Sequence, residues 1–304
     1  MIGTIVSALA PIALVTALGW FAGRWKVLPD NAAAVLAGFV VTFALPLSLF
    51  LAAVAAKPSE ILNPPYLAAL AAGLVGSYAI GLLLARFAFQ RTLPEASVQA
   101  IAASFPNMAY CGPPVLIAAI GPSAVLAVVI GNLIVTLILI PLTLVLLGGS
   151  GGIARAIRSA VLQPLVLLPV FGAVLAVAGV RLPDLLTSSV DEIGRAAGGT
   201  ALFTLGLILS RITPRIDRDV LVNVSLKNVV QPALILGTGM AVGLSGDQLA
   251  QVFLIGVLPA ATAVPTLALA HQTYADEAAA SVMASTLFAI LSISGGIAIV
   301  GALS

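Results

Sequence analysis

Long runs of apolar residues separated by short polar connections dominate the pattern of this chain. The runs are continuous and do not alternate residue by residue, which favours helices over the strands of a membrane barrel. Because about 20 apolar residues cross a bilayer as a helix, each run is long enough for one span. The pattern predicts ten transmembrane helices, over residues 2–22, 31–55, 66–90, 97–120, 122–147, 159–180, 187–210, 219–244, 248–271 and 276–302.

Composition agrees with this pattern. Of the 304 residues, 61% are apolar and only 8% are charged, and the mean hydropathy is +1.19. Soluble domains carry about 25% charged residues, so the composition excludes a soluble globular protein and indicates a lipid bilayer as the surroundings. The net charge of +2 without a basic run gives no reason to expect a nucleic-acid partner.

Lysine and arginine predict the orientation. Ten of the thirteen lie in connections after odd-numbered spans or at the entrance to the following span. Cytoplasmic loops are enriched in these residues, so both termini are expected outside the cytoplasm. Lys227, at the start of the eighth span, is expected to extend its ammonium toward the interface and not to bind an anion.

The two halves of the chain resemble each other at spacings of 153 to 160 residues. The matching pairs are Pro11 with Pro164, Leu28-Pro29-Asp30 with Leu182-Pro183-Asp184, Phe43-Ala44-Leu45 with Phe203-Thr204-Leu205, and Pro106 with Pro259. Each half holds five spans, and an odd number forces the second half to enter the membrane from the opposite face. We therefore predict a first repeat at 1–147, a cytoplasmic linker at 148–158 and an inverted second repeat at 159–304. The alternative is coincidence among common residues.

Prolines interrupt the fourth and ninth spans near their middles. They are Pro106, Pro113 and Pro114 in the fourth span, and Pro259 and Pro265 in the ninth. A proline inside a helix costs about 3 kcal/mol or more, and the backbone groups that it frees survive at membrane depth only inside protein or beside a wet cavity. We predict two broken helices that cross near the bilayer centre. The alternative is that the prolines merely kink two packed helices.

These two breaks are the candidate substrate site. The second half of each helix is expected to begin at about Pro113 and Pro265, and both N-termini would direct free N–H groups and positive dipole ends at one point, which attracts an anion. Asn107 and Thr262 supply polar side chains there. Cys111, the single cysteine, is expected to line the cavity and to form no disulfide within the chain.

Asp191, Glu192 and Arg195 open the seventh span. A carboxylate in a membrane segment is a candidate for proton coupling. Acidic residues also favour the first turn of a helix at the membrane interface, because they interact with its dipole. Both interpretations of Asp191 and Glu192 stay open.

The ordered set of motifs resembles the auxin efflux carrier family over nearly the whole chain. The crossover signature is Pro106-Asn107-Met108-Ala109-Tyr110-Cys111-Gly112-Pro113-Pro114, and weaker motifs are Phe43–Phe50, Ala201–Leu207, Lys227–Pro232, Leu258-Pro259 and Ala284–Leu287. Only a short connection joins the halves, which is similar to the bacterial members, including malonate transporters, and unlike the plant carriers with a large loop.

The resemblance implies two inverted five-helix repeats, a scaffold of spans one, two, six and seven, and a transport domain that carries the crossover. It also implies a homodimer through the scaffold, elevator-type transport of a small organic anion, and a substrate contact at Asn107. The expected substrate-binding residues are Asn107, Tyr110, Cys111, Gly112, Pro113, Thr204, Pro259, Thr262 and Pro265.

We therefore expect an all-α secondary carrier of a small carboxylate, driven by protons or the membrane potential. No enzyme motif, metal-ligand spacing or cofactor-binding loop is present in the sequence. Two alternatives remain. One is a sodium-coupled organic anion symporter like the bile acid carriers, and the other is a membrane receptor that binds the anion without moving it.

Overall fold

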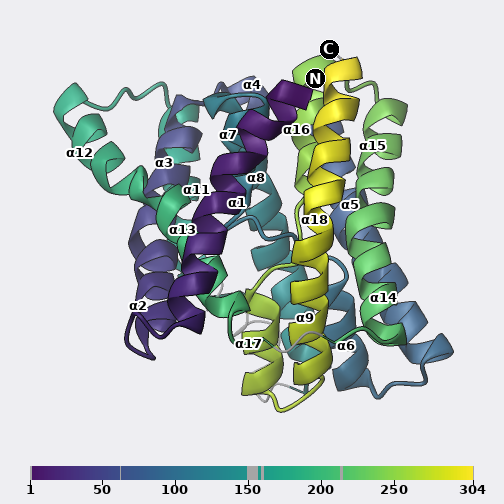
Figure 1. Cartoon of the computed structure of the whole chain (residues 1–304). Helices are drawn as coiled ribbons and strands as arrows, with labels where there is room; N and C mark the ends of the chain where they lie inside the picture. The colour runs from purple at the N-terminus through teal and green to yellow at the C-terminus, as the bar shows by residue number, and fades with distance from the viewer. Residues whose placement is uncertain (1, 62, 149–156, 159–160, 213–214, 304) are drawn as a thin grey trace. The chain divides into compact units, whose positions relative to one another are not determined.

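The computed structural model describes residues 2–61, 63–148, 157–158, 161–212 and 215–303, and within these ranges the chain is helical. One isolated β-bridge, between Pro106 and Ala260, is the only extended pairing among the described residues. Helices occur in every one of the ten predicted apolar runs (Figure 1). Most of the predicted linker, residues 149–156, lies outside the described residues.

Five of the described helices are long and apolar enough to cross a membrane. They are Ala32–Ala55, Pro64–Ala88, Pro122–Leu146, Arg218–Ala241 and Ala275–Gly301. The predicted all-helical class with membrane-spanning helices is therefore confirmed in this coarser form, whereas ten spans in two inverted repeats stay a prediction.

The helices pack into two compact units, each of which takes segments from both halves of the chain. Unit 1 contains Met1–Asn63, Ala109–Ile130 and Leu162–Arg211; unit 2 contains Pro64–Met108, Gly131–Val161 and Ile212–Ser304. The units are defined by packing and the predicted repeats by sequence similarity, so neither division tests the other.

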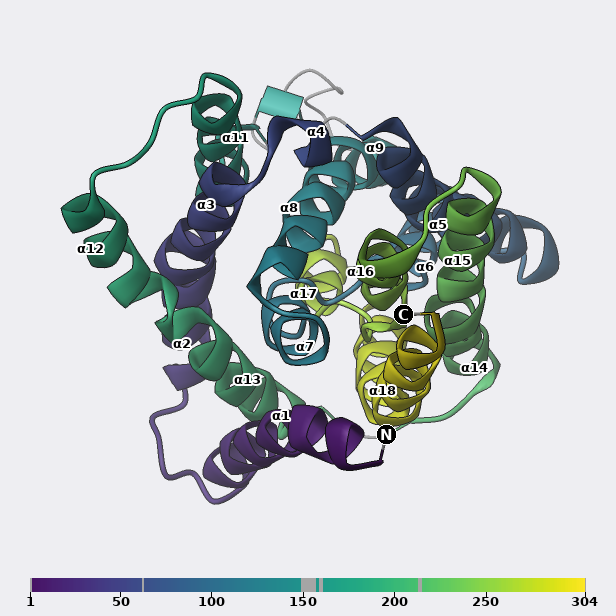
Figure 2. The same ribbon diagram turned by 90° about the horizontal axis from the view of Figure 1, so that it is seen from above.

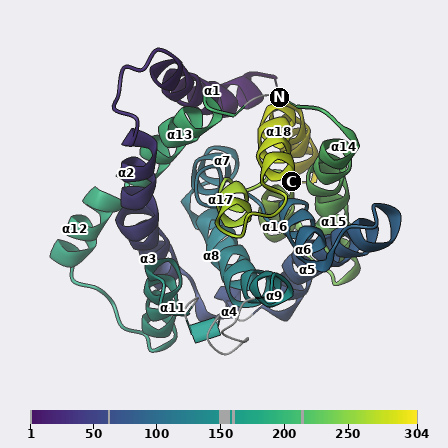
Figure 3. The ribbon, with the colours of Figure 1, turned by 90° about the horizontal axis from the view of Figure 1, so that it is seen from below.

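Unit 1 is built on two pairs of packed helices. Its elements are α1 (Ile2–Arg24), α2 (Ala32–Phe39), η1 (Val40–Ala44), α3 (Leu45–Ala55), α4 (Pro58–Ile61), α7 (Gly112–Ala119), η3 (Pro122–Ala124), the first part of α8 (Val125–Ile134), α11 (Pro164–Val177), α12 (Asp184–Gly194) and α13 (Ala196–Leu209). Helix α1 packs along α13 (Figure 3) and α3 packs along α11.

Glycine allows the close approach of these pairs. A Cβ atom at Gly206 of α13 would overlap the carbonyl oxygen of Thr16 in α1, and one at Gly19 would overlap that of Phe203. A Cβ at Gly172 of α11 would lie 2.6 Å from the carbonyl oxygen of Phe50 in α3. Small residues let membrane helices pack backbone against backbone, so both pairs depend on the missing side chain.

Unit 2 holds both residues of the β-bridge, Pro106 and Ala260. Its elements are the rest of α8, α5 (Pro64–Leu83), η2 (Leu84–Ala88), α6 (Leu93–Ala102), η4 (Val135–Leu139), α9 (Ile140–Leu146), α14 (Arg218–Ser225), η5 (Leu226–Val230), α15 (Gln231–Ala241), α16 (Gly246–Val257), α17 (Ala263–Ala270) and α18 (Ala275–Leu303). Helix α15 packs against α5 and α16, and α18 packs against α14, α16 and α17 (Figure 2).

Three of the four π turns among the described residues are followed directly by a helix with proline as its second residue. Pro46, Pro141 and Pro232 are the second residues of the helices that follow η1, η4 and η5. The carbonyl group four residues before each of these prolines belongs to the π turn. A proline ring clashes with that carbonyl in an α-helix, and the wider π turn relieves the clash without breaking the helix.

At one end of unit 2, polar residues from three connections between helices are joined by an ion pair and a hydrogen bond. Arg91 forms an ion pair with Asp219 at 3.1 Å, and the Tyr274 hydroxyl donates to Asp219 Oδ1 at 3.0 Å. Burial is the largest single effect and lowers the pKa of Arg91, but the charge and hydrogen bond of Asp219, with smaller effects of Tyr274 and Glu95, together raise it above its ordinary value. These residues follow the third, seventh and ninth predicted spans, whose connections were all expected on the same side.

The glycine packing predicts a stability difference between two Gly→Ala changes. Gly206→Ala forces a methyl group into the α1 backbone, so we expect it to lower the melting temperature in detergent, with overpacking of about 1–3 kcal/mol. The matched control is Gly38→Ala in α2, where a Cβ would meet no atom within 4 Å. Both changes raise helix propensity, so equal melting temperatures for the two variants would contradict the packing argument.

Candidate functional site

The described helices end before, and begin again within or after, both proline-rich segments. Helix α6 ends at Ala102 and α7 begins at Gly112, while α16 ends at Val257 and α17 begins at Ala263. Pro113 is the second residue of α7, as expected for a proline in a first turn. Pro265 is the third residue of α17, so this helix begins two residues earlier than the predicted start.

Two backbone hydrogen bonds join the breaks inside unit 2. The Asn107 N–H donates to the Pro259 carbonyl at 2.7 Å, and the Ala261 N–H donates to the Phe105 carbonyl at 2.8 Å. Phe105 and Pro259 are 154 residues apart, and so are Asn107 and Ala261. Replacing each residue of one bond by the residue 154 positions away therefore gives the other bond. This spacing lies within the range of 153 to 160 found for the similarity between the two halves of the sequence.

Lys227 supports the second break. Its side chain is fully buried, and Nζ donates to the carbonyl oxygens of Gly256 at 2.9 Å and Leu258 at 2.6 Å. The prediction that this ammonium extends to the interface is wrong. Helix α16 stops at the break, so its last carbonyls have no partner within the helix and the negative end of its dipole is left inside protein. The Lys227 side chain supplies hydrogen-bond donors to these carbonyls at the negative end of the dipole.

Three further side chains satisfy the backbone of the second break. The Ala260 N–H donates to Ser285 Oγ at 2.8 Å, and the Ser285 hydroxyl donates to Asn228 Oδ1 at 2.5 Å. Asn228 Nδ2 donates to Ser292 Oγ at 3.2 Å, and the Ser292 hydroxyl donates to the Val257 carbonyl at 2.9 Å. The extended segment is thereby held by a chain of hydrogen bonds from α18 and η5.

Gln231 supports the first break from the same stretch of helix. Its Nε2 donates to the Ser104 carbonyl at 2.6 Å and to Ser77 Oγ at 2.9 Å, so it links this helix to two other segments of unit 2. Lys227 and Gln231 are four residues apart and so lie on one side of the helix. One helical turn therefore supplies donors to both breaks.

The structure brings together the predicted site residues that belong to unit 2. Asn107 is 1% exposed and lies on the bridge to Pro259. Thr262 is buried and directly precedes α17, and its side chain does not cap that helix. Pro106 lies opposite Ala260 on the bridge. The second break thus presents Ala260 and Ala261 where the first has Pro106 and Asn107.

The remaining predicted residues belong to unit 1. Tyr110, Cys111 and Gly112 are buried at the start of α7, and Cys111 is a free thiol. Thr204 is buried in α13, where its hydroxyl donates to the Thr200 carbonyl at 2.6 Å. Glu192 is exposed on α12.

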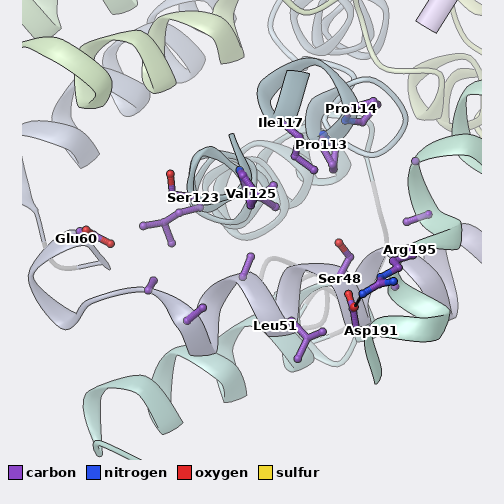
Figure 4. Close-up of a pocket in the computed structure, with 18 residues that line it drawn as sticks. Ser48, Leu51, Glu60, Pro113, Pro114, Ile117, Ser123, Val125, Asp191 and Arg195 are labelled. Atoms are coloured by element: carbon purple, nitrogen blue, oxygen red, sulfur yellow. Dashed lines mark ion pairs between the residues drawn. The ribbon is translucent and has the colours of Figure 1, made fainter. Parts of the chain in front are cut away.

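Unit 1 also contains a cavity of about 600 Å³, which the sequence did not predict (Figure 4). Its wall comes from α3, α4, α7, η3, α8, α12 and α13, and includes Pro113, Pro114, Asp191 and Arg195. Asp191 and Arg195 form an ion pair of 2.5 Å. Tyr110, Thr204 and Glu192 are not in its lining. Small-molecule sites measure about 300–1,000 Å³, so the volume suits a ligand.

No group of three or more His, Cys, Asp or Glu side chains that could hold a metal ion occurs among the described residues.

Comparisons with known proteins place this geometry in context. The profile of a family described as "Membrane transport protein" matches residues 4–157 and 152–297. The chain is 30% identical over 297 residues to "Uncharacterized transporter YfdV" of Escherichia coli (strain K12), with 94% of this chain and 95% of that protein covered. It is 27% identical over 299 residues to "Putative malonate transporter" of Rhizobium meliloti (strain 1021), with 91% and 90% covered.

The contacts of Lys227 predict that Lys227→Met destabilises the protein. Methionine fits the same space but leaves two buried carbonyls without a donor, at about 1–3 kcal/mol for each. We expect a lower melting temperature in detergent. Lys57→Met, at an exposed lysine, is the matched control. A Lys227→Met protein that melts with the wild type would contradict the role assigned to this lysine.

Proposed function

The chain belongs to the membrane transport protein family, which is the auxin efflux carrier family, and on that premise we propose that it is a secondary active carrier of a small organic anion whose substrate binds at the joined breaks. The observation that carries the proposal is the reciprocal pair of backbone hydrogen bonds beside the buried amide of Asn107. Broken helices that meet in this way are the usual substrate sites of carriers built from repeats.

The local charge favours an anion. Helix α17 begins directly after Thr262, so its first N–H groups and the positive end of its dipole lie at the second break. Lys227 adds a buried hydrogen-bond donor at this break, with Nζ 2.6 Å from the Leu258 carbonyl. Asn107 carries both a donor and an acceptor, which can orient a bound carboxylate. A relative named as a malonate transporter also supports a carboxylate substrate.

The proposed mechanism is alternating access of the elevator type, in ten spans arranged as two inverted repeats. The spacing of 154 residues supports the repeats, because it relates the two bridge bonds and also separates Ser77 from Gln231, which are hydrogen-bonded to each other. Unit 1 collects the first, second, sixth and seventh predicted spans together with Ala109–Ile130. Apart from Ala109–Ile130, that division supports a scaffold and a transport part, and a homodimer through the scaffold belongs to the same proposal.

A bacterial inner membrane with both termini outside the cytoplasm belongs to the same proposal. The orientation rests on the distribution of Lys and Arg, and the meeting of Arg91, Asp219 and Tyr274 at one end of unit 2 supports a shared side for their connections. The bacterial membrane rests on the similarity to bacterial transporters.

The contacts of Lys227 argue against sodium coupling. Sodium sites in broken-helix carriers use unwound carbonyls and the C-terminal ends of half-helices. Here the Gly256 and Leu258 carbonyls at the end of α16 already accept hydrogen bonds from an ammonium. We therefore favour protons or the membrane potential as the energy source over the sodium-coupled alternative.

Replacing sodium by potassium on both sides of the membrane should leave uptake unchanged. The measurement is the initial rate of uptake into proteoliposomes of malonate, or of another carboxylate that stabilises the purified protein in a thermal-shift screen. A rate that collapses without sodium would restore the symporter alternative.

Asn107→Ala should lower uptake by about 10-fold or more, because a buried amide that binds a charged group contributes about 1.5–3 kcal/mol. The variant should still fold, since alanine keeps the N–H that donates to Pro259. Kinetics of uptake and the melting temperature are measured together, with Asn31→Ala at an exposed asparagine as the control. Unchanged kinetics would sink the site assignment. Binding without uptake in the wild type would instead favour the receptor alternative.

A further inference from the structure

A groove in unit 2 lies between α14 and α18, which pack side by side (Figure 3). Its volume is about 300 Å³, and among the described residues that line it every one except Arg215 is apolar. Ile216, Leu221 and Leu287 of this lining are more than half exposed. Both helices belong to segments that are long and apolar enough to cross a membrane, so the open side of the groove faces the hydrocarbon of a bilayer.

One end of the groove, which we call its head, carries charges of both signs. Arg215 Nε lies 2.6 Å from Asp217 Oδ2, and Arg215 Nη1 lies 3.9 Å from Glu277 Oε1. Glu277 precedes the lining residue Ala280 by three positions, so it lies on the same side of α18, one turn away. The side chain of Arg215 is 51% exposed, so a ligand at the membrane interface can reach its guanidinium.

The two carboxylates at the head differ in what they already bind. Asp217 Oδ1 accepts a hydrogen bond from the Val220 N–H at 3.0 Å and so caps α14, and Asp217 Oδ2 makes the close pair with Arg215. The contact of Glu277 with Arg215 is longer than a hydrogen bond. Glu277 is therefore the carboxylate with room to accept hydrogen bonds from a ligand.

The charges at the head select among lipid headgroups. One guanidinium and two carboxylates sum to a formal charge of −1, so a purely anionic headgroup meets repulsion beside its one attractive partner. A headgroup with a phosphate and a primary ammonium fits both signs, because the phosphate accepts from Arg215 and the ammonium donates to Glu277. A quaternary ammonium has no N–H group to donate.

We propose that this groove binds one phospholipid with an ethanolamine headgroup. An acyl chain fills the apolar part between α14 and α18, the phosphate lies at Arg215 and the ammonium at Glu277. Basic pockets between membrane helices on the cytoplasmic side bind lipid headgroups, and Arg215 lies in a connection expected on that side. The inference goes beyond the proposed carrier function and does not depend on it.

The lipid would bridge the two helices that support the second break. Helix α14 continues through η5 to Lys227, and α18 carries Ser285 and Ser292, whose hydrogen bonds hold the extended segment. A ligand that binds only the folded protein stabilises it. Phosphatidylethanolamine should therefore raise the melting temperature of the delipidated protein.

The test is titration of the delipidated full chain with three lipids of identical oleoyl chains, with bound lipid counted by native mass spectrometry. The lipids are phosphatidylethanolamine, phosphatidylglycerol and phosphatidylcholine. We expect one phosphatidylethanolamine to bind about 10-fold more tightly than either of the other two lipids. Arg215→Gln should weaken its binding by about 10-fold or more, because the phosphate loses a charged hydrogen-bond partner.

Glu277→Gln should act in opposite directions on two of the lipids. It removes the acceptor for the ammonium, so phosphatidylethanolamine binds more weakly, and it removes a repulsive charge, so phosphatidylglycerol binds more tightly. A purely structural role of Glu277 would move both affinities in the same direction. The matched controls are Arg24→Gln and Asp276→Asn, at exposed residues that do not line the groove.

The apolar part of the site has its own variant. Ala284→Phe places a ring in the groove and should displace the acyl chain, which weakens the binding of all three lipids. Ile290→Phe, at an exposed residue of α18 outside the groove, is the control. The melting temperature without lipid shows that each variant is folded, and the comparison of lipids on the wild type needs no variant.

Three results would overturn the proposal. The first is equal affinity of the wild type for phosphatidylethanolamine and phosphatidylglycerol, which indicates unselective lipid around the protein. The second is a change of both affinities in the same direction in Glu277→Gln. The third is a lower oligomeric state of Ala284→Phe with lipid binding unchanged, which would assign the groove to a second copy of the chain.

Discussion

The fold depends on satisfying backbone groups where two helices stop inside the protein. An unpaired N–H or carbonyl buried away from water is expensive, and in a bilayer no solvent is at hand to replace the lost partner. Unit 2 meets this constraint in two ways. The breaks pair with each other through Asn107 and Ala261, and side chains on α18 and the η5–α15 stretch supply the remaining partners.

The stretch from η5 to α15 supplies hydrogen-bond donors to both breaks. Its π turn precedes Pro232 and carries Lys227, and Gln231 follows it directly. The proline therefore forces a wide turn at the place where the helix must present donors to both breaks. Breaks, π turn and buried lysine form one connected arrangement, and a change in any of them alters the support of the others.

The sequence predicted the features that have local causes and missed those that arise from packing. The breaks at Pro106–Pro114 and Pro259–Pro265 were predictable because two or three prolines fall close together in each apolar run, and each removes a backbone donor from its own helix. The burial of Lys227 was not, because its partners are the carbonyls of Gly256 and Leu258, about thirty residues away in the chain. The cavity beside Arg195 was missed for the same reason, since its wall comes from seven separate elements. The ion pair of Asp191 and Arg195, four residues apart, was its only trace in the sequence.

The reciprocal bonds between the two breaks are made by main-chain atoms alone, and this leaves their side chains free to differ. Any residue other than proline can provide the N–H at 107 and 261, so one half can keep an amide while the other keeps a methyl group. The pairing of the two breaks therefore places no requirement on the side chains at 107 and 261 beyond the exclusion of proline. A substitution at either position can change the chemistry beside the breaks without removing the two hydrogen bonds that join them.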